Sequence, residues 1–298
     1  MYRTYRRHFP KFVFDAMQHF WSTEDRAERI HLRESFGPQV SRSITVDTGP
    51  FPIEFTMCFD LDEGHDLGMF QQAFNHQQYE PEVTHWIVTH LDPGDVFVDV
   101  GCNNGYYSVL ASKVVGRTGK VLAFDPNPKA FSRMTRNRDT NAAVNITAHC
   151  MALSDQTAMA TLYVDETEDG LSTLTSREHV SRRGGAAVVI PMDRLDNLLG
   201  GAVPRVVKVD VEGHELRVLR GMERLLDSPE CPCLIVEWNP EYATEELLDY
   251  LGRRFEIYQS PDGSAEGAPT SVTDVRQLPV RRICNLLCVP KGWQGTSN

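Results

Sequence analysis

Long hydrophobic runs are missing from this sequence of 298 residues, and so is an excess of positive charge. No stretch of 18 apolar residues occurs, so we expect no membrane-spanning segment. The basic residues near the start, such as Arg6 and Arg7, precede no apolar segment, so we expect no secretory signal either. With 30 Lys and Arg against 41 Asp and Glu, the net charge of −11 argues against nucleic acid or an anionic membrane as the main partner.

Cysteines are few, and their spacing does not form a metal-binding pattern. The seven cysteines match neither a disulfide framework nor the paired C-x-x-C units of a zinc site. Cys231 and Cys233, like Cys284 and Cys288, are an even number of residues apart in strand-like runs, which places each pair on one face of a strand. We therefore expect reduced, buried thiols in a cytoplasmic protein.

The phosphate-binding pattern G-x-G-x-x-G is also absent, although a glycine turn is present. The apolar run Val96–Val100 predicts a buried strand, and Gly101 and Gly105 follow it before a segment of helical periodicity. Strand, turn and helix in this order are typical of a nucleotide-type site. Asp125 ends the next apolar strand, about 20 residues further on, where an acid can bind ribose hydroxyls.

The chemistry of this turn favours a cationic ligand. The turn has no nearby Lys or Arg to meet a phosphate, and Asp99 would repel an anion but attract an ammonium group. A ligand with an amine, a ribose and no phosphate fits these residues, and S-adenosylmethionine is such a ligand. An NAD-dependent oxidoreductase is disfavoured because it would need the missing third glycine.

Alternating strands and helices predict an α/β fold. We expect a doubly wound, Rossmann-like sheet of seven mostly parallel strands, with right-handed crossovers and an antiparallel last strand. The expected strands cover residues 96–100, 121–124, 145–153, 206–210, 234–238, 255–258 and 283–289. An N-terminal cap precedes them, with helical segments within residues 1–40 and a hairpin over residues 44–57.

Acidic residues gather where the predicted strands end. Asp99, Asp125, Asp210 and Glu237 all fall at or next to the carboxyl ends of apolar strands. Ligands of doubly wound sheets bind beyond these ends, so the four side chains should share one rim of the sheet. This convergence is the strongest functional signal in the sequence.

Several motifs between residues 44 and 290 together carry a family resemblance. They are Tyr79-Glu80-Pro81-Glu82, Asp99-x-Gly101-x-Asn103-x-Gly105-Tyr106-Tyr107, Phe124-Asp125-Pro126-Asn127-Pro128, Ala152-Leu153-Ser154-Asp155, Gly170-Leu171-Ser172-Thr173-Leu174, Leu195-Asp196 and Lys208-Val209-Asp210-Val211-Glu212-Gly213-His214-Glu215. In this order they resemble the FkbM family of methyltransferases. Two positions depart from the family pattern: Cys102 replaces a small residue, and Asp125 replaces the commoner Glu, which keeps the carboxylate but shortens its reach.

The resemblance implies a class I methyltransferase sheet that binds S-adenosylmethionine. The resemblance implies that the methionine part of the cofactor is surrounded by Asp99, Gly101, Asn103 and Gly105. It implies that Asp125 binds the ribose hydroxyls. It also implies that the adenine lies near Leu153, Ser154 and Asp155. Residues from the same motifs complete the candidate cofactor set: Glu80, Asn104, Pro126 and Asn127. Taken singly, Asp99 could instead cap the next helix, and Asp155 could merely make a turn.

The pattern of segments along the chain suggests a domain organisation. Residues 1–75 would form the helical and hairpin cap, and residues 76–298 the methyltransferase domain. A segment around residues 156–190 would be inserted in that domain. Its polar part, residues 165–185, is either a solvated loop or a mobile cover over the site.

Methyl transfer from a sulfonium is an in-line displacement, so the protein must align the reactants and, for a hydroxyl acceptor, accept a proton. His214 and Asp210 are the leading candidates for the base, because histidine titrates near neutral pH and burial raises the pKa of a carboxyl group. Glu212 and Glu237 complete the catalytic candidates, although Glu212 could instead cap the following helix. An Mg²⁺ ion held by Asp210 and Glu237 is conceivable but not favoured, because two carboxylates fall short of a site.

These inferences predict an S-adenosylmethionine-dependent O-methyltransferase that acts on a hydroxyl of a small molecule, natural product or glycan. The alternative on the same fold is N- or carboxyl-methylation, and the alternative from another class is a non-catalytic nucleotide-fold binding protein. FkbM-like enzymes methylate sugars, polyketides and other natural products, so the resemblance does not select the acceptor. A homo-oligomer is left open.

Overall fold

The computed structural model describes residues 23–48, 51–164, 172, 174, 186–260, 269–273, 277–278 and 283–293. The helical segments expected before residue 23, the Gly49-Pro50 turn and most of the polar segment 165–185 lie outside this range. Within it, no helix has the length and apolar character needed to cross a membrane. No disulfide joins the seven cysteines, all of which lie in the described residues.

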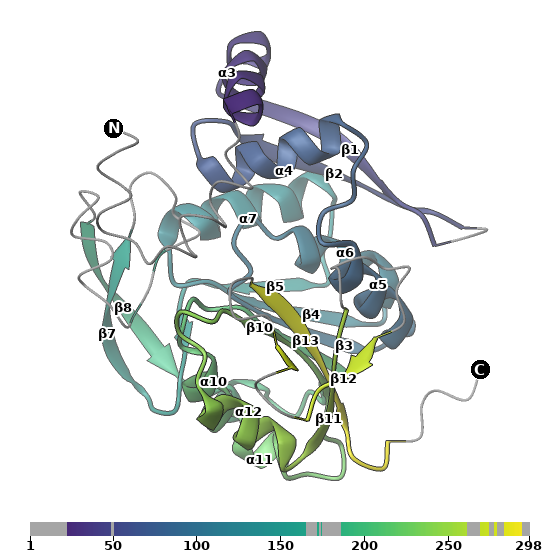
Figure 1. The fold of residues 1–298 in the computed structure, drawn as a ribbon, viewed down its shortest axis with the longest axis vertical. Coiled ribbons are helices and arrows are strands. Elements are labelled where there is room, and N and C mark those ends of the chain that lie inside the picture. The colour runs from purple at the N-terminus through teal and green to yellow at the C-terminus, as the bar shows by residue number, and fades with distance from the viewer. Residues whose placement is uncertain are drawn as a thin grey trace.

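The main body is an eight-stranded mixed sheet with helices on both faces (Figure 1). Its strands are β3 (Val96–Val100), β4 (Lys120–Phe124), β5 (Ile146–His149), β9 (Val206–Val209), β10 (Cys233–Trp238), β11 (Phe255–Gln259), β12 (Thr270–Ser271) and β13 (Cys284–Pro290). The strand order is β12-β11-β13-β10-β9-β3-β4-β5. Neighbours from β10 to β5 pair in parallel, whereas β13 is antiparallel to both β10 and β11.

The fold class expected from the sequence is therefore confirmed. The sheet is doubly wound and Rossmann-like, and its last strand, β13, runs antiparallel. The antiparallel strand inserts between β10 and β11 instead of extending an edge. The short strand β12 adds an eighth member to the seven expected, because it pairs with the outer edge of β11.

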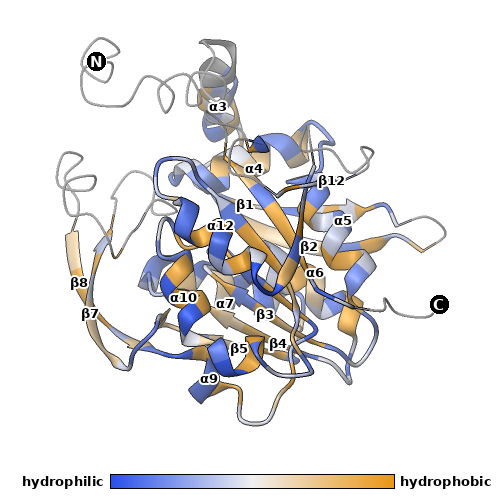
Figure 2. Cartoon of the chain, turned by 60° about the horizontal axis from the view of Figure 1, so that its bottom comes forward, coloured by the Kyte–Doolittle hydropathy of each residue, from blue (hydrophilic) through white to orange (hydrophobic). Residues whose placement is uncertain are grey.

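Helices cover the sheet because its strands are apolar on both sides. One face carries α5 (Pro81–His90), α6 (Tyr106–Val115) and α7 (Pro128–Thr140), and the other carries α9 (Leu195–Leu198), α10 (Glu215–Gly221), α11 (Glu223–Leu226) and α12 (Glu245–Gly252). Successive residues of β3 point to opposite faces: Phe97 packs in the cluster with Leu110, and Val98 in the cluster with Leu219. Hydrophobic and hydrophilic residues alternate along α10 and α12, as helices with one buried face require (Figure 2).

The strand expected over residues 145–153 is wrong as one element. Strand β5 ends at His149, and β6 (Ala152–Leu153) leaves the main sheet to pair with β8 (Ala186–Asp193). Strand β8 also forms an antiparallel hairpin with β7 (Ala158–Val164), and this hairpin extends away from the main sheet (Figure 1). The sequence stays apolar between β5 and β6, so its pattern does not reveal where one strand ends and the next begins. The two strands differ only in the strands with which they pair.

The N-terminal part contains the expected helix and hairpin. Its elements are α3 (Thr23–Phe36), β1 (Gln39–Val46), β2 (Ile53–Asp60) and α4 (Gly64–Phe74). Strands β1 and β2 pair along eight residues, and Phe55 and Met57 of β2 share one hydrophobic cluster with Phe97 of the main sheet. The hairpin is thus packed against the sheet domain, and a domain boundary at residue 75 stays a prediction.

Candidate functional site

The glycine turn after β3 brings two segments of backbone into contact. Gly101 has a φ of +81°, and a Cβ atom there would lie 1.7 Å from the carbonyl oxygen of Asp210. Gly105 caps α6 with a φ of +84°, where a Cβ would lie 2.8 Å from Cγ of Met134. Both glycines are therefore required by close packing as well as by a left-handed backbone.

Asp99 is the buried acid of β3. Its Oδ2 accepts a hydrogen bond of 2.6 Å from the Ser108 hydroxyl on α6. Its Oδ1 is buried and accepts no hydrogen bond from the residues that the structure describes. Burial raises the pKa of Asp99, although Lys208, its neighbour across β3 and β9, opposes the shift. A cationic ligand would supply the partner that Oδ1 lacks.

Asp125 follows β4 and ties the glycine turn to the next helix. Its Oδ1 accepts from the backbone N–H of Asn127 at 2.9 Å, and its Oδ2 accepts from that of Asn103 at 2.8 Å. Asn127 in turn caps α7, since its side-chain oxygen accepts from the Lys129 N–H at 3.0 Å. Pro126 lies between these two anchored residues. The carboxylate expected at the ribose is thus held by two backbone donors.

The two asparagines of the turn have different partners. Asn103, with a φ of +46°, accepts a hydrogen bond from the Arg133 guanidinium at 3.0 Å. Asn104 is buried, and its amide donates to Asp66 at 2.7 Å while its oxygen accepts from the Tyr106 N–H at 3.2 Å. The Asn104 side chain therefore links the glycine turn to α4 through Asp66 and to the start of α6 through Tyr106.

Lys208 is a buried residue that the sequence argument did not select for the site. Its Nζ donates to Oδ2 of Asp210 at 2.6 Å and lies 5.1 Å from the centre of the Tyr107 ring. Burial alone would lower the pKa of Lys208, but the charges of Asp210 and Asp99 raise it above its ordinary value. The signal that could have revealed it is a lysine inside the otherwise apolar strand β9.

Glu80 joins this buried network from the start of α5. Its backbone has a φ of +35°, and its carboxylate accepts a hydrogen bond of 2.5 Å from the Tyr107 hydroxyl. Burial raises the pKa of Glu80 to about 7, although the charge of Lys208 opposes this shift. The network therefore connects α5, α6 and β9 beneath the carboxyl ends of the strands.

The expected adenine residues lie next to His214. Leu153 is buried at the end of β6, and the Ser154 hydroxyl lies 2.9 Å from Nε2 of His214. Asp155 forms an ion pair with Arg217 at 3.3 Å. Burial, reinforced by Arg217, lowers the pKa of His214 to about 4. The structure therefore places His214 with Ser154 and Asp155, and His214 is not a member of the carboxylate cluster described next.

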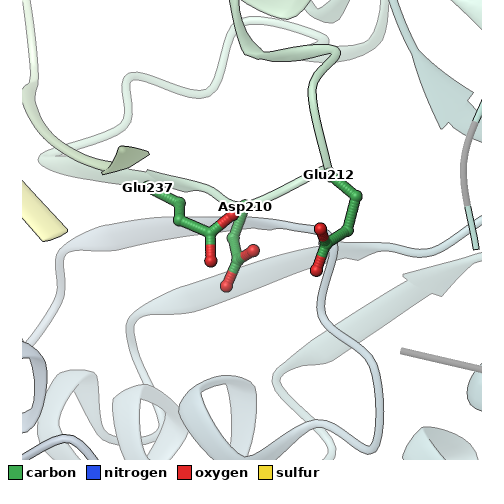
Figure 3. Close-up of side chains that lie close together, drawn as sticks. All are labelled: Asp210, Glu212 and Glu237. Carbon is green, nitrogen blue, oxygen red and sulfur yellow. The ribbon is translucent and has the colours of Figure 1, made fainter. Parts of the chain in front are cut away.

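Asp210, Glu212 and Glu237 form that cluster (Figure 3). One carboxylate oxygen of each lies within 4.8 Å of the others. Asp210 directly follows β9 and keeps 28% of its side chain exposed, whereas burial and the charge of Asp210 raise the pKa of both Glu212 and Glu237 well above the usual range. Because β10, β9, β3 and β4 are adjacent, Asp99 and Asp125 lie at the carboxyl ends of the neighbouring strands.

Comparison with known proteins identifies related sequences. The sequence profile of the methyltransferase FkbM domain matches residues 99–258, which is more than half of the chain. The hexuronic acid methyltransferase AglP of Haloferax volcanii is 34% identical over 152 residues, which cover 50% of this chain and 59% of that protein. Methyltransferase 1 of Beauveria bassiana is 28% identical over 151 residues, covering 44% and 60%. The chain thus spans about 60% of the length of these relatives.

Among solved structures, the methyltransferase FkbM of Methylobacillus flagellatus is 16% identical, with a TM-score of 0.43 over 74% of this chain and 51% of that one. The matched region of the family profile begins at Asp99 and includes the glycine turn, Asp125 and the three clustered carboxylates. It therefore covers nearly all the residues that form the candidate site. The chain belongs to the FkbM family of methyltransferases.

Proposed function

We propose that this protein is an S-adenosylmethionine-dependent methyltransferase that methylates a hydroxyl group of a small molecule or glycan. The observation that carries the proposal is the row of acids, Asp99, Asp125, Asp210 and Glu237, at the carboxyl ends of four adjacent parallel strands. When bound, the cofactor supplies an electrophilic methyl group on a sulfonium centre. The chain's residues bind the donor, orient the acceptor and take up the proton.

The acidic residues at the ends of β3 and β4 suit this cofactor. Asp99 has a buried oxygen without a donor among the described residues, which suits the ammonium of the methionine part. Asp125 is held by two backbone N–H groups, and a carboxylate is a suitable acceptor for ribose hydroxyls. Leu153, Ser154 and Asp155 would contact the adenine, with His214 holding the Ser154 hydroxyl.

Asp210 is the base that the geometry favours. A base must reach the acceptor, and the Asp210 side chain is 28% exposed whereas His214 is 7% exposed. The ammonium of Lys208, 2.6 Å away, fixes the orientation of the Asp210 carboxylate. His214 points its Nε2 at Ser154, so we assign it to positioning the cofactor side of the site rather than to proton transfer.

A sugar-like acceptor is supported by one relative, which is named for its action on a hexuronic acid. A hexuronic acid offers several hydroxyls and one carboxylate, so it could be methylated at either kind of oxygen. We favour a hydroxyl because the rim is acidic and would repel an acceptor carboxylate next to the clustered acids. A screen of paired hexoses and hexuronic acids, with the methylated atom located by NMR, separates these two outcomes.

Cofactor binding is the first test of the proposal. Isothermal titration should show that the protein binds S-adenosylhomocysteine and that Asp99→Asn weakens this binding at least 10-fold, because the variant cannot pair with the ammonium. Asp92→Asn is the matched control, since Asp92 lies before the amino end of the same strand and should leave the affinity unchanged. Unaltered binding in Asp99→Asn would remove Asp99 from the site, and no binding by the wild type would favour a non-catalytic protein.

A further inference from the structure

The three clustered carboxylates come from two neighbouring strand ends. Asp210 follows β9, Glu212 comes two residues later in the same turn, and Glu237 lies near the end of β10. Val236 of β10 pairs with Val209 of β9, so the next residues, Glu237 and Asp210, emerge side by side. Figure 3 shows the three side chains directed to the same region below the turn.

Glu237 supplies a second and independent observation. The carboxylate of Glu237 is enclosed by protein, although part of the residue is exposed. Its Oε2 accepts no hydrogen bond from the described residues, and the side chain points into the cluster (Figure 3). A buried carboxylate oxygen without a donor is costly, and a bound cation would remove that cost.

The charge of the cluster is not balanced by its nearest lysine. Lys208 bonds to Asp210 and also faces Asp99 across the β3–β9 pair. The charge of Lys208 is therefore shared among Asp210, Asp99 and Glu80 and is not devoted to the cluster. A cation between the three carboxylates, whose oxygens lie within 4.8 Å of one another, would balance the negative charge gathered there.

We propose that Asp210, Glu212 and Glu237 bind a divalent cation of the oxygen-preferring kind, Mg²⁺ or Mn²⁺. An all-carboxylate donor set matches these ions, whereas zinc prefers nitrogen and sulfur ligands, and His214 is not part of the group. The sequence argument against Mg²⁺ counted two carboxylates, and the tertiary structure adds the third.

The use of this ion rests on the proposed function. Three carboxylates leave coordination positions open, because Mg²⁺ takes six oxygen ligands in octahedral geometry. Two neighbouring hydroxyls of a sugar could fill them. The ion would then orient the acceptor and make its bound hydroxyl more acidic, with Asp210 at the edge of the site.

A titration with Mn²⁺ followed by electron paramagnetic resonance tests the site without any methyl transfer. The wild type should bind one Mn²⁺, Mg²⁺ should compete for it, and Glu237→Gln and Glu212→Gln should each weaken Mn²⁺ binding at least 10-fold. Glutamine keeps the shape of the side chain, so circular dichroism should show folded variants. Glu241→Gln is the control, because it removes a charge close to Glu212 outside the cluster and should change the affinity by about twofold at most.

Absence of Mn²⁺ binding by the wild type, or binding that both glutamine variants retain in full, would overturn the metal site. Titration of the same samples with S-adenosylhomocysteine separates this failure from failure of the proposed function. Glu237→Gln should keep its affinity for S-adenosylhomocysteine while losing Mn²⁺, since the proposed cofactor contacts are with Asp99 and Asp125 and not with Glu237. Loss of both ligands in a folded Glu237→Gln would contradict a distinct cation site.

Discussion

The residue types in the candidate site depend on close contacts, and a sequence pattern indicates only some of these contacts. The glycines of the turn were singled out because strand, glycine turn and helix in this order are typical of a nucleotide-type site. The structure adds a second reason at Gly101, where there is no room for a Cβ beside the carbonyl of Asp210. The turn and the segment that carries the clustered acids are therefore positioned against each other.

The substitution Gly101→Ala measures this contact. It should destabilise the protein by roughly 3 kcal/mol or more, through the left-handed backbone and the overlap with the Asp210 carbonyl. Gly201→Ala is the matched control, because Gly201 has a φ of +87° with nothing within 4 Å of an added Cβ. It should lose only roughly 1–2 kcal/mol. Urea unfolding of both variants gives the comparison, and equal losses would mean that the contact contributes nothing.

His214 makes stability depend on pH with a definite sign. The pKa of His214 is about 4 in the folded protein and 6.5 for an ordinary histidine, so between these values the unfolded chain binds the extra proton. The contribution to stability is thus fully present above pH 6.5 and is lost as the pH falls towards 4. Between pH 7 and 5 the loss should be roughly 2 kcal/mol.

His214→Gln should remove this part of the pH dependence. Urea unfolding at pH 5, 6 and 7 is the measurement, and the exposed His76→Gln serves as the control that follows the wild type. If His214→Gln loses as much stability as the wild type between pH 7 and 5, the buried neutral histidine is not the cause.

Residue identity alone could not have assigned the partners of Lys208 and His214. A lysine in an apolar strand is either an edge residue or a buried ion-pair partner, and the choice depends on the acids that the fold brings near it. His214 was expected beside Asp210 because they are close in sequence. The fold turns it instead to Ser154, which lies 60 residues away along the chain.

Among the elements, helix α7 and strand β2 show how the N-terminal hairpin is attached. Asn137 of α7 is buried, and its oxygen accepts from the Cys58 N–H at 2.7 Å while its amide donates to the Asn104 carbonyl at 2.8 Å. Asn141, one turn later, bonds to both the N–H and the carbonyl of Thr56. Two helical asparagines thus take the place of a neighbouring strand at the edge of β2.

Asn137→Ala should therefore destabilise the protein by roughly 2–4 kcal/mol, because it leaves the Cys58 N–H and the Asn104 carbonyl without partners. The control is Asp139→Ala, an exposed position of the same helix with a similar gain in helix propensity. Its stability should stay within about 0.5 kcal/mol of the wild type. Thermal unfolding checks both, and a neutral Asn137→Ala would show that water replaces these bonds.

The expected helices and strands were mostly correct where the sequence pattern of a single segment determines the element. Helices α5 and α7 both begin at prolines, which are well tolerated in the first turn of a helix. The region after β4 was misassigned because one apolar run serves two sheets. Strand β5 pairs with β4 through His149 and Phe124, whereas Ala152 pairs with Met192 in the smaller sheet.

At the scale of the whole molecule, the strand order decides the site. Strands β10, β9, β3 and β4 are adjacent although the segments that form them are up to 142 residues apart, from Val96 to Trp238. Because these four strands pair in parallel, all four carboxyl ends lie on the same edge of the sheet. The hairpin β7–β8 and the N-terminal helices lie at the periphery of this sheet (Figure 1).

The sequence by itself determined the fold class, the glycine turn and the acids at the strand ends, because these depend on local periodicity and on backbone conformation at single residues. Only the tertiary structure decided which acids meet. It brought Glu212 together with Asp210 and Glu237, paired Lys208 with Asp210 and directed His214 to Ser154 instead. The physical reason is that contacts between side chains on different strands depend on register and burial, which no local pattern contains.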